Sequence, residues 1–138
     1  MLKIKPKHVR RMLDVAHVIK RWSACPSGRQ HACVLADAGK YIVSTGYNGL
    51  TAPCRHEKVC NTLCKTDMQT KCKATHAEVN AVRNLHRIPL GLIIAFVTKR
   101  PCINCEESLR AAGVARVYWE EIDHLRVVDR GTKLLCQP

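Results

Sequence analysis

The feature that most constrains the fold of this chain is a split motif, His76-Ala77-Glu78 followed by Pro101-Cys102-Ile103-Asn104-Cys105. One histidine and two cysteines fill three corners of a zinc tetrahedron and leave the fourth for water, whereas a structural zinc site is closed by four protein ligands. The chain must therefore fold so that two distant segments meet at one point. We take His76, Cys102 and Cys105 as the candidate ligands of a catalytic zinc ion.

Glu78 is the candidate catalytic residue of this motif. A carboxylate close to a water on the metal can accept its proton and pass it on. An alternative exists, because Thr75-His76-Ala77-Glu78 also fits a capping box, in which Glu78 bonds back to the backbone N–H of Thr75. The complete pattern H-x-E…P-C-x-x-C is the signature of zinc nucleobase deaminases, which favours the catalytic role.

Length and composition predict one compact domain in a reducing compartment. The 138 residues suit a single domain, and no apolar run approaches the roughly 20 residues of a membrane helix. The N-terminus lacks the apolar region of a signal peptide, so nine cysteines favour thiolate metal ligands over disulfides. We therefore expect a cytoplasmic protein that does not contact a membrane.

The net charge of +12 indicates an anionic partner. Residues 1–29 hold eight lysines or arginines and only one acidic residue, Asp14. These charges fit attraction of a phosphate, on a nucleotide or on a polymer. A solvated helix face explains the same pattern equally well.

Helical and strand-like segments alternate along the chain. Apolar spacing predicts helices over 7–22 and 75–87, and Pro101 opens a third that ends near Gly113. Strands are expected at 31–36, 41–45, 92–98 and 114–119, and the tail 122–135 fits either a helix or a strand. This alternation predicts an α/β fold in which helices cover the faces of one sheet. Both halves of the motif then fall at helix starts, which should lower the pKa of the two thiols.

The chain resembles the cytidine deaminase superfamily, and within it the deoxycytidylate (dCMP) deaminases. The resemblance extends beyond the metal motif to Ser44-Thr45-Gly46-Tyr47-Asn48-Gly49, Thr75 to Ala81, Phe96 to Cys102 and Ala112 to Tyr118. It implies a three-layer α-β-α fold with a mixed central sheet of about five strands. It also implies a homo-oligomer that acts on a small nucleotide.

The resemblance suggests substrate contacts as well. Asn48 would contact a sugar hydroxyl, and the backbone N–H of Ala77 would contact the pyrimidine carbonyl. Ser23 and Arg29 are weaker candidates for the 5′-phosphate. The chain departs from the family at Gln30-His31-Ala32, where the family usually has Val-Gly-Ala. His31 could therefore alter the pocket, add a phosphate contact, or be an ordinary strand residue.

A second cluster of soft ligands occupies the segment 50–74, which has no clear period. It is interpreted as a Cys/His-rich insertion into a single deaminase domain of residues 1–138. Some dCMP deaminases carry a similar insertion that binds a structural zinc, which would order a segment with little apolar surface. The candidate ligands are Cys54, Cys60, Cys64 and Cys72, with His56 as a substitute.

Three functions are compatible with these patterns. The leading hypothesis is zinc-dependent hydrolysis of dCMP to dUMP with release of ammonia. The second is deamination of a base in single-stranded DNA or tRNA, which the positive charge favours. The third is a zinc-stabilised module that binds nucleic acid without catalysis, which Glu78 and the open fourth position speak against.

Overall fold

The computed structural model describes residues 4–23, 30–49, 75–86, 91–123 and 126–135. Five strands in this part of the chain form one sheet in the order β2-β1-β3-β4-β5. The strands are β1 (Ala32–Asp37), β2 (Tyr41–Tyr47), β3 (Ile93–Val97), β4 (Val114–Asp123) and β5 (Arg126–Leu134). The helices are α1 (Pro6–Ile19), continued by the 3-10 turn η1 (Lys20–Trp22), α4 (Ala77–Arg83) and α5 (Ile103–Ala111).

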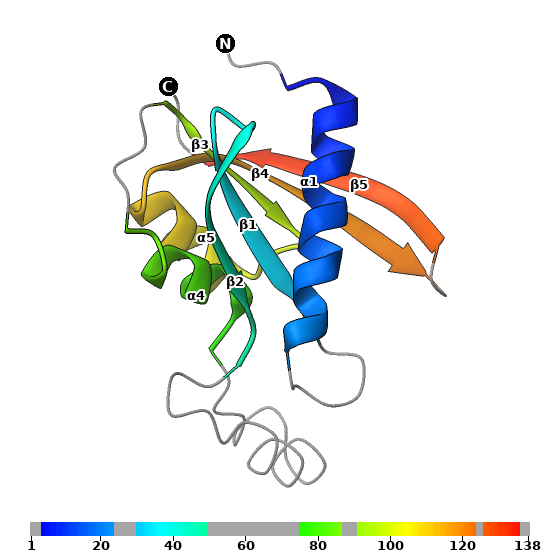
Figure 1. The fold of residues 1–138 in the computed structure, drawn as a ribbon, viewed down its shortest axis with the longest axis horizontal. Coiled ribbons are helices and arrows are strands. Elements are labelled where there is room, and N and C mark those ends of the chain that lie inside the picture. Colours follow the sequence, from blue (N-terminus) through cyan, green and yellow to red (C-terminus); the bar gives the residue numbers. More distant parts are fainter. Residues whose placement is uncertain (1–3, 24–29, 50–74, 87–90, 124–125, 136–138) are drawn as a thin grey trace, which may run out of the picture.

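The sheet is mixed and lies between two helical layers. Strands β3 and β4 are parallel, and the other three neighbouring pairs are antiparallel. Helix α1 covers one face of the sheet, and α4 and α5 cover the other (Figure 1). The expected three-layer α-β-α architecture with a five-stranded mixed sheet is confirmed.

Alternating side chains divide the core into two halves. Cys33 and Leu35 of β1 join Ala95 and Val97 of β3 under α4 and α5. The intervening residues of both strands face α1, whose buried stripe is Val9, Met12, Leu13, Ala16 and Ile19. Every residue of β3 is buried, as its nearly continuous apolar sequence predicts for a strand covered on both faces. No helix in the described ranges has the length and hydropathy needed to span a membrane.

Several expected boundaries are corrected. The first helix tightens into η1 over its last turn, as helix ends commonly do. The second ends at Arg83, four residues early, and the third begins at Ile103 because Cys102 has an extended backbone. The ambiguous tail is a strand, since β5 pairs with β4 from Arg116–Leu134 to Asp123–Arg126.

Candidate metal centre and active site

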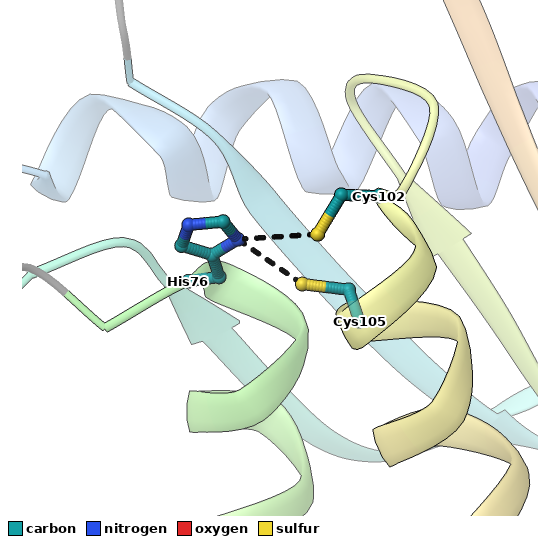
Figure 2. A group of neighbouring side chains, drawn as sticks. All are labelled: His76, Cys102 and Cys105. Atoms are coloured by element: carbon teal, nitrogen blue, oxygen red, sulfur yellow. Dashed lines mark hydrogen bonds between the residues drawn. The ribbon is translucent and has the colours of Figure 1, made fainter. Parts of the chain in front are cut away.

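Two helix starts present the three candidate metal ligands. His76 is the N-cap residue of α4, and Cys102 is the N-cap residue of α5. Cys105 lies one turn into α5, and all three side chains point toward one another (Figure 2). The split motif therefore meets where two helices on the same face of the sheet begin.

The distances between the donor atoms fit a tetrahedral zinc ion. His76 Nδ1 lies 3.1 Å from Cys105 Sγ and 3.8 Å from Cys102 Sγ, and the three donor atoms lie within 4.8 Å of one another. Zinc bonds of ordinary length at tetrahedral angles separate nitrogen and sulfur ligands by about 3.6 Å. The two observed distances bracket this value, and the soft donor set is one that zinc prefers. His76 and Cys102 are exposed while Cys105 is buried, so the group is reached from one side.

Glu78 is buried beside this group, with only 6% of its surface exposed. Burial raises the pKa of its carboxyl group above the usual value, and a hydrogen bond to Cys105 and the charge of His76 partly oppose this rise. A raised pKa brings a carboxyl group closer to neutral pH, where a general acid–base works best. The capping-box alternative is wrong, because the N–H of Thr75 donates to the carbonyl of Gly49 at 2.8 Å.

The expected lowering of the thiol pKa does not hold for Cys105. Burial, the nearby charge of Glu78 and the contact with Cys102 raise the pKa of this thiol instead. These effects outweigh the partial positive charge of the helix start. Cys105 is therefore a neutral thiol until a cation displaces its proton.

Helix α4 is fastened directly to the edge strand β2. Asn80 Nδ2 donates to the carbonyl of Tyr47 at 2.9 Å, and Asn84 Nδ2 donates to the carbonyl of Thr45 at 2.9 Å. Gly46 lies between these two carbonyls and touches the helix backbone without an intervening side chain. The edge strand thereby fixes the helix that carries His76 and Glu78.

The predicted substrate contacts form a second small network. Asn48 is 8% exposed, its Oδ1 accepts the backbone N–H of His31 at 2.8 Å, and its own N–H donates to the His31 carbonyl at 3.2 Å. Ser23 Oγ donates to the Asn48 carbonyl at 2.7 Å, so this hydroxyl helps to fix the backbone that follows β2 at Asn48. Ala77 is the first residue of α4, where a backbone N–H has no acceptor within the helix.

The remaining candidates lie outside the described residues. These are Arg29 and the ligands assigned to the second site, Cys54, His56, Cys60, Cys64 and Cys72. The segment 50–74 that holds the cysteine cluster is bracketed by Gly49 and Thr75. These two residues form an isolated antiparallel bridge, and Thr75 comes two residues before the start of α4.

Sequence reasoning missed a cavity of about 650 Å³ at the loop that leads from β3 to α5. Its lining includes Lys20, Lys99, Arg100 and Pro101, the last immediately before the ligand Cys102. The available signal was the pair of basic residues placed directly before the Pro-Cys motif. His31, identified only as a departure from the family pattern, also lines this cavity.

Comparison with known proteins agrees with the geometry. The family described as the cytidine and deoxycytidylate deaminase zinc-binding region matches residues 6–121. A deoxycytidylate deaminase of Mycobacterium phage D29 is 28% identical over 116 residues, which cover 78% of this chain and 89% of the relative. ComE operon protein 2 of Bacillus subtilis is 31% identical over 109 residues, which cover 77% of this chain and 55% of the relative. The chain thus spans only about half the length of the Bacillus protein.

The fold has a solved counterpart as well. The dCMP deaminase of cyanophage S-TIM5, crystallised with dCMP and dUMP, aligns with a TM-score of 0.70 and 22% identity, covering 85% of this chain and 83% of that one. The family match covers most of the chain and includes both halves of the metal motif. The chain therefore belongs to the cytidine and deoxycytidylate deaminase family of zinc-dependent hydrolases.

Proposed function

We propose that this protein hydrolyses the amino group of a cytosine nucleotide, converting dCMP to dUMP and releasing ammonia. The observation that carries the proposal is the convergence of His76, Cys102 and Cys105 beside the buried carboxyl group of Glu78. A histidine and two thiols leave one position of a tetrahedral zinc for a reactant. The phage relatives named as deoxycytidylate and dCMP deaminases support dCMP as the substrate.

The proposed chemistry uses Glu78 as a proton shuttle. Zinc held by the three ligands would lower the pKa of a bound water from 15.7 toward about 7. Glu78 accepts a proton from the attacking water and delivers it to ring nitrogen N3, which makes carbon C4 more electrophilic. The water oxygen bonds to C4, Glu78 takes the remaining proton from that oxygen and passes it to the amine, and the C4–N bond breaks. A carbonyl group remains at C4, and ammonia leaves.

Other groups near the site would hold the nucleotide in place. The N–H of Ala77 is proposed to donate to the pyrimidine carbonyl at C2, and Asn48 to contact a sugar hydroxyl. The reciprocal bonds between Asn48 and His31 support this role, because they fix the loop before a ligand arrives. A preorganised contact loses less entropy when substrate binds.

The wider assembly is also part of the proposal. Residues 1–138 are taken as one deaminase domain with an insertion at 50–74, whose cysteines bind a second, structural zinc. The bridge between Gly49 and Thr75 supports the insertion, since it joins the two ends of that segment. We further propose a homo-oligomer, as the resemblance to the dCMP deaminases implies. We also propose a reducing compartment such as the cytoplasm, because thiolate ligands require reduced cysteines.

A product assay with a matched pair of variants tests the proposed function. Ammonia release is measured with cytidine, dCMP, CMP, dCTP, 5-methyl-dCMP, a tRNA and a single-stranded oligonucleotide. Glu78→Gln should retain zinc and the fold but lose roughly 10²–10⁴-fold in kcat. Glu107→Gln removes an exposed carboxylate on α5 and should leave kcat unchanged. Turnover by Glu78→Gln at the parent rate would refute the shuttle role.

Deamination of a polymer is the second candidate, favoured by the net charge of +12. Binding of a polymer should weaken by orders of magnitude between low and moderate salt, whereas one phosphate gives a shallow slope. If the parent releases ammonia from no cytosine or adenine compound, a nucleic-acid-binding module without catalysis becomes the better interpretation.

A further inference from the structure

The side of α1 that faces away from the sheet carries a stripe of positive charge. Helix α1 covers one face of the sheet, and α4 and α5 cover the other (Figure 1). One side of α1 is buried in the core, so residues three and four apart on its opposite side are exposed together. This exposed stripe, which η1 continues, consists of Lys7, Arg10, Arg11, Asp14, Val18 and Arg21. Four of these six side chains are cationic, and only Asp14 is acidic.

Further positive charge gathers at the N-terminal end of the stripe. Lys5, just before α1, and Lys40, in the turn between β1 and β2, are both exposed. The pKa of His8 is lowered by desolvation and then by the charges of its cationic neighbours, which are Lys7, Arg11, Lys40 and Lys5. Among the described residues, none of these four cations forms an ion pair with an acidic side chain. Such a concentration of one charge favours an anionic partner.

Two exposed aromatic side chains lie at the other end of the stripe. Trp22 is the last residue of η1 and is 68% exposed, and Tyr47 is the last residue of β2 and is 39% exposed. Their rings meet edge to face, with centroids 6.3 Å apart. This contact uses at most one face of each ring, so the pair still offers ring faces to a stacking partner. Tryptophan is highly buried on average in folded proteins, which makes the exposure of Trp22 a sign of a partner that covers it.

The charge of the stripe selects among the partners that could cover it. A two-fold contact between two copies of this chain would bring the stripe against the same patch of the second copy, and facing like charges oppose such a contact. A single strand of nucleic acid complements the surface in both respects. Its phosphates form charge-assisted hydrogen bonds with lysine and arginine, and its unpaired bases stack on exposed aromatic rings. The stripe extends over about 20 Å of helix, which is long enough to contact several successive phosphates.

We propose that the stripe of α1 and the Trp22–Tyr47 pair form a binding surface for a single strand of nucleic acid. The cations of the stripe hold the phosphates, and bases stack on the aromatic pair. The pair adjoins the elements of the candidate active site, because Tyr47 directly precedes Asn48 and its carbonyl accepts a hydrogen bond from Asn80 of α4 at 2.9 Å. The surface binds a strand with or without cytosine, so it extends beyond the proposed deamination of dCMP.

Tryptophan fluorescence of the zinc-loaded protein tests the stacking. The chain has two tryptophans, and Trp119 is only 7% exposed, so a bound base should quench the emission of Trp22. The probe is an oligothymidine of about 15 nucleotides, which contains no cytosine. Trp22→Phe retains an aromatic ring and should keep an affinity close to that of the parent without the quenching. Trp22→Leu should lose roughly tenfold or more in affinity, measured by the anisotropy of a labelled strand.

The salt dependence of binding tests the charged stripe. Affinity of the parent for oligothymidine should fall steeply as salt rises, because each phosphate contact releases counterions. Arg11→Gln should reduce the slope of log affinity against log salt concentration by about 0.7, the value for one contact with a single strand. Arg83→Gln is the matched control, because Arg83 is an exposed arginine of α4 on the opposite face of the sheet. This variant should keep the slope of the parent.

Several results would overturn the proposal. These are the absence of oligothymidine binding at low salt, equal affinity of Trp22→Leu and the parent, equal slopes for Arg11→Gln and Arg83→Gln, and a duplex of the same length bound at least as tightly. Self-association in sedimentation that Trp22→Leu abolishes would assign the aromatic pair to a second copy instead. None of these measurements requires turnover. Strand binding by a protein that deaminates nothing would therefore still support the surface, and an active dCMP deaminase that binds no strand would contradict the surface alone.

Discussion

Replacing Gly46 with alanine is expected to push α4 away from β2 and disable the candidate metal site. An ideal Cβ at Gly46 would lie 2.3 Å from the backbone N of Ala81 and 2.5 Å from the backbone O of Ala77. Ordinary van der Waals contacts begin near 3.4 Å, so the strand and the helix would have to separate by about 1 Å. Backbone atoms on both sides leave no flexible side chain to absorb this displacement.

The consequence for the site follows from what α4 carries. His76 caps this helix and Glu78 lies in its first turn, whereas Cys102 and Cys105 belong to α5 and would not move with it. A misplacement of about 1 Å can cost roughly 100-fold in rate. The crowded interface itself should cost about 1–3 kcal/mol of unfolding free energy.

The assay measures kcat with dCMP, zinc content and the urea midpoint of the same preparations. Gly113→Ala is the matched control, because Gly113 has a φ of 87° and nothing lies within 4 Å of its ideal Cβ. Alanine there should cost about 1–2 kcal/mol through backbone strain, without displacing α4. The reasoning is refuted if Gly46→Ala keeps the parental kcat and zinc content, or if Gly113→Ala loses as much kcat.

Three further outcomes follow from the same geometry. Asn80→Ala and Asn84→Ala each remove one hydrogen bond from α4 to β2. We expect each variant to bind zinc more weakly than the parent in chelator competition, and the double variant to bind it more weakly than either single variant. Unchanged zinc affinity would contradict the anchoring role of these two side chains. Zinc binding at neutral pH should release at least one proton because the raised pKa of Cys105 keeps its thiol protonated. Calorimetry in buffers of different ionisation enthalpy measures the number of protons released per zinc ion, and a value of zero would disprove this prediction. The folded protein lowers the pKa of His31 to about 4, so below pH 6.5 the unfolded state binds a proton there that the folded state does not bind. The free energy of unfolding should therefore fall as the pH falls from 6.5 to 4. Urea midpoints at pH 7 and pH 5 should differ less for His31→Gln than for the parent, and an equal difference in both proteins would contradict this role of His31.

Much of the fold could be predicted because its signals are local. The apolar stripe of α1 and the buried run of β3 follow directly from residue spacing and composition. The tail was ambiguous because its pattern fits two structures, and only pairing with β4 makes it a strand. The early end of α4 was not predictable, since Asn84 there bonds to Thr45, a residue of a distant strand.

The same distinction separates the parts of the site. The spacing of the split motif indicated that His76, Cys102 and Cys105 would meet, because a metal requires it. The raised pKa of Cys105 could not be anticipated, since it depends on how deeply the packed helices bury the thiol. His31 and Lys99 line one cavity because the tertiary fold brings their two segments together, and no local sequence signal specifies that approach.

Anomalous diffraction at the zinc absorption edge tests the central claim most directly. Crystals of the zinc-loaded protein should show a peak bonded to His76 Nδ1, Cys102 Sγ and Cys105 Sγ, with one position left for a water or substrate beside Glu78. A fully loaded crystal without a peak among these three atoms, or with a fourth protein ligand closing the site, would contradict the account.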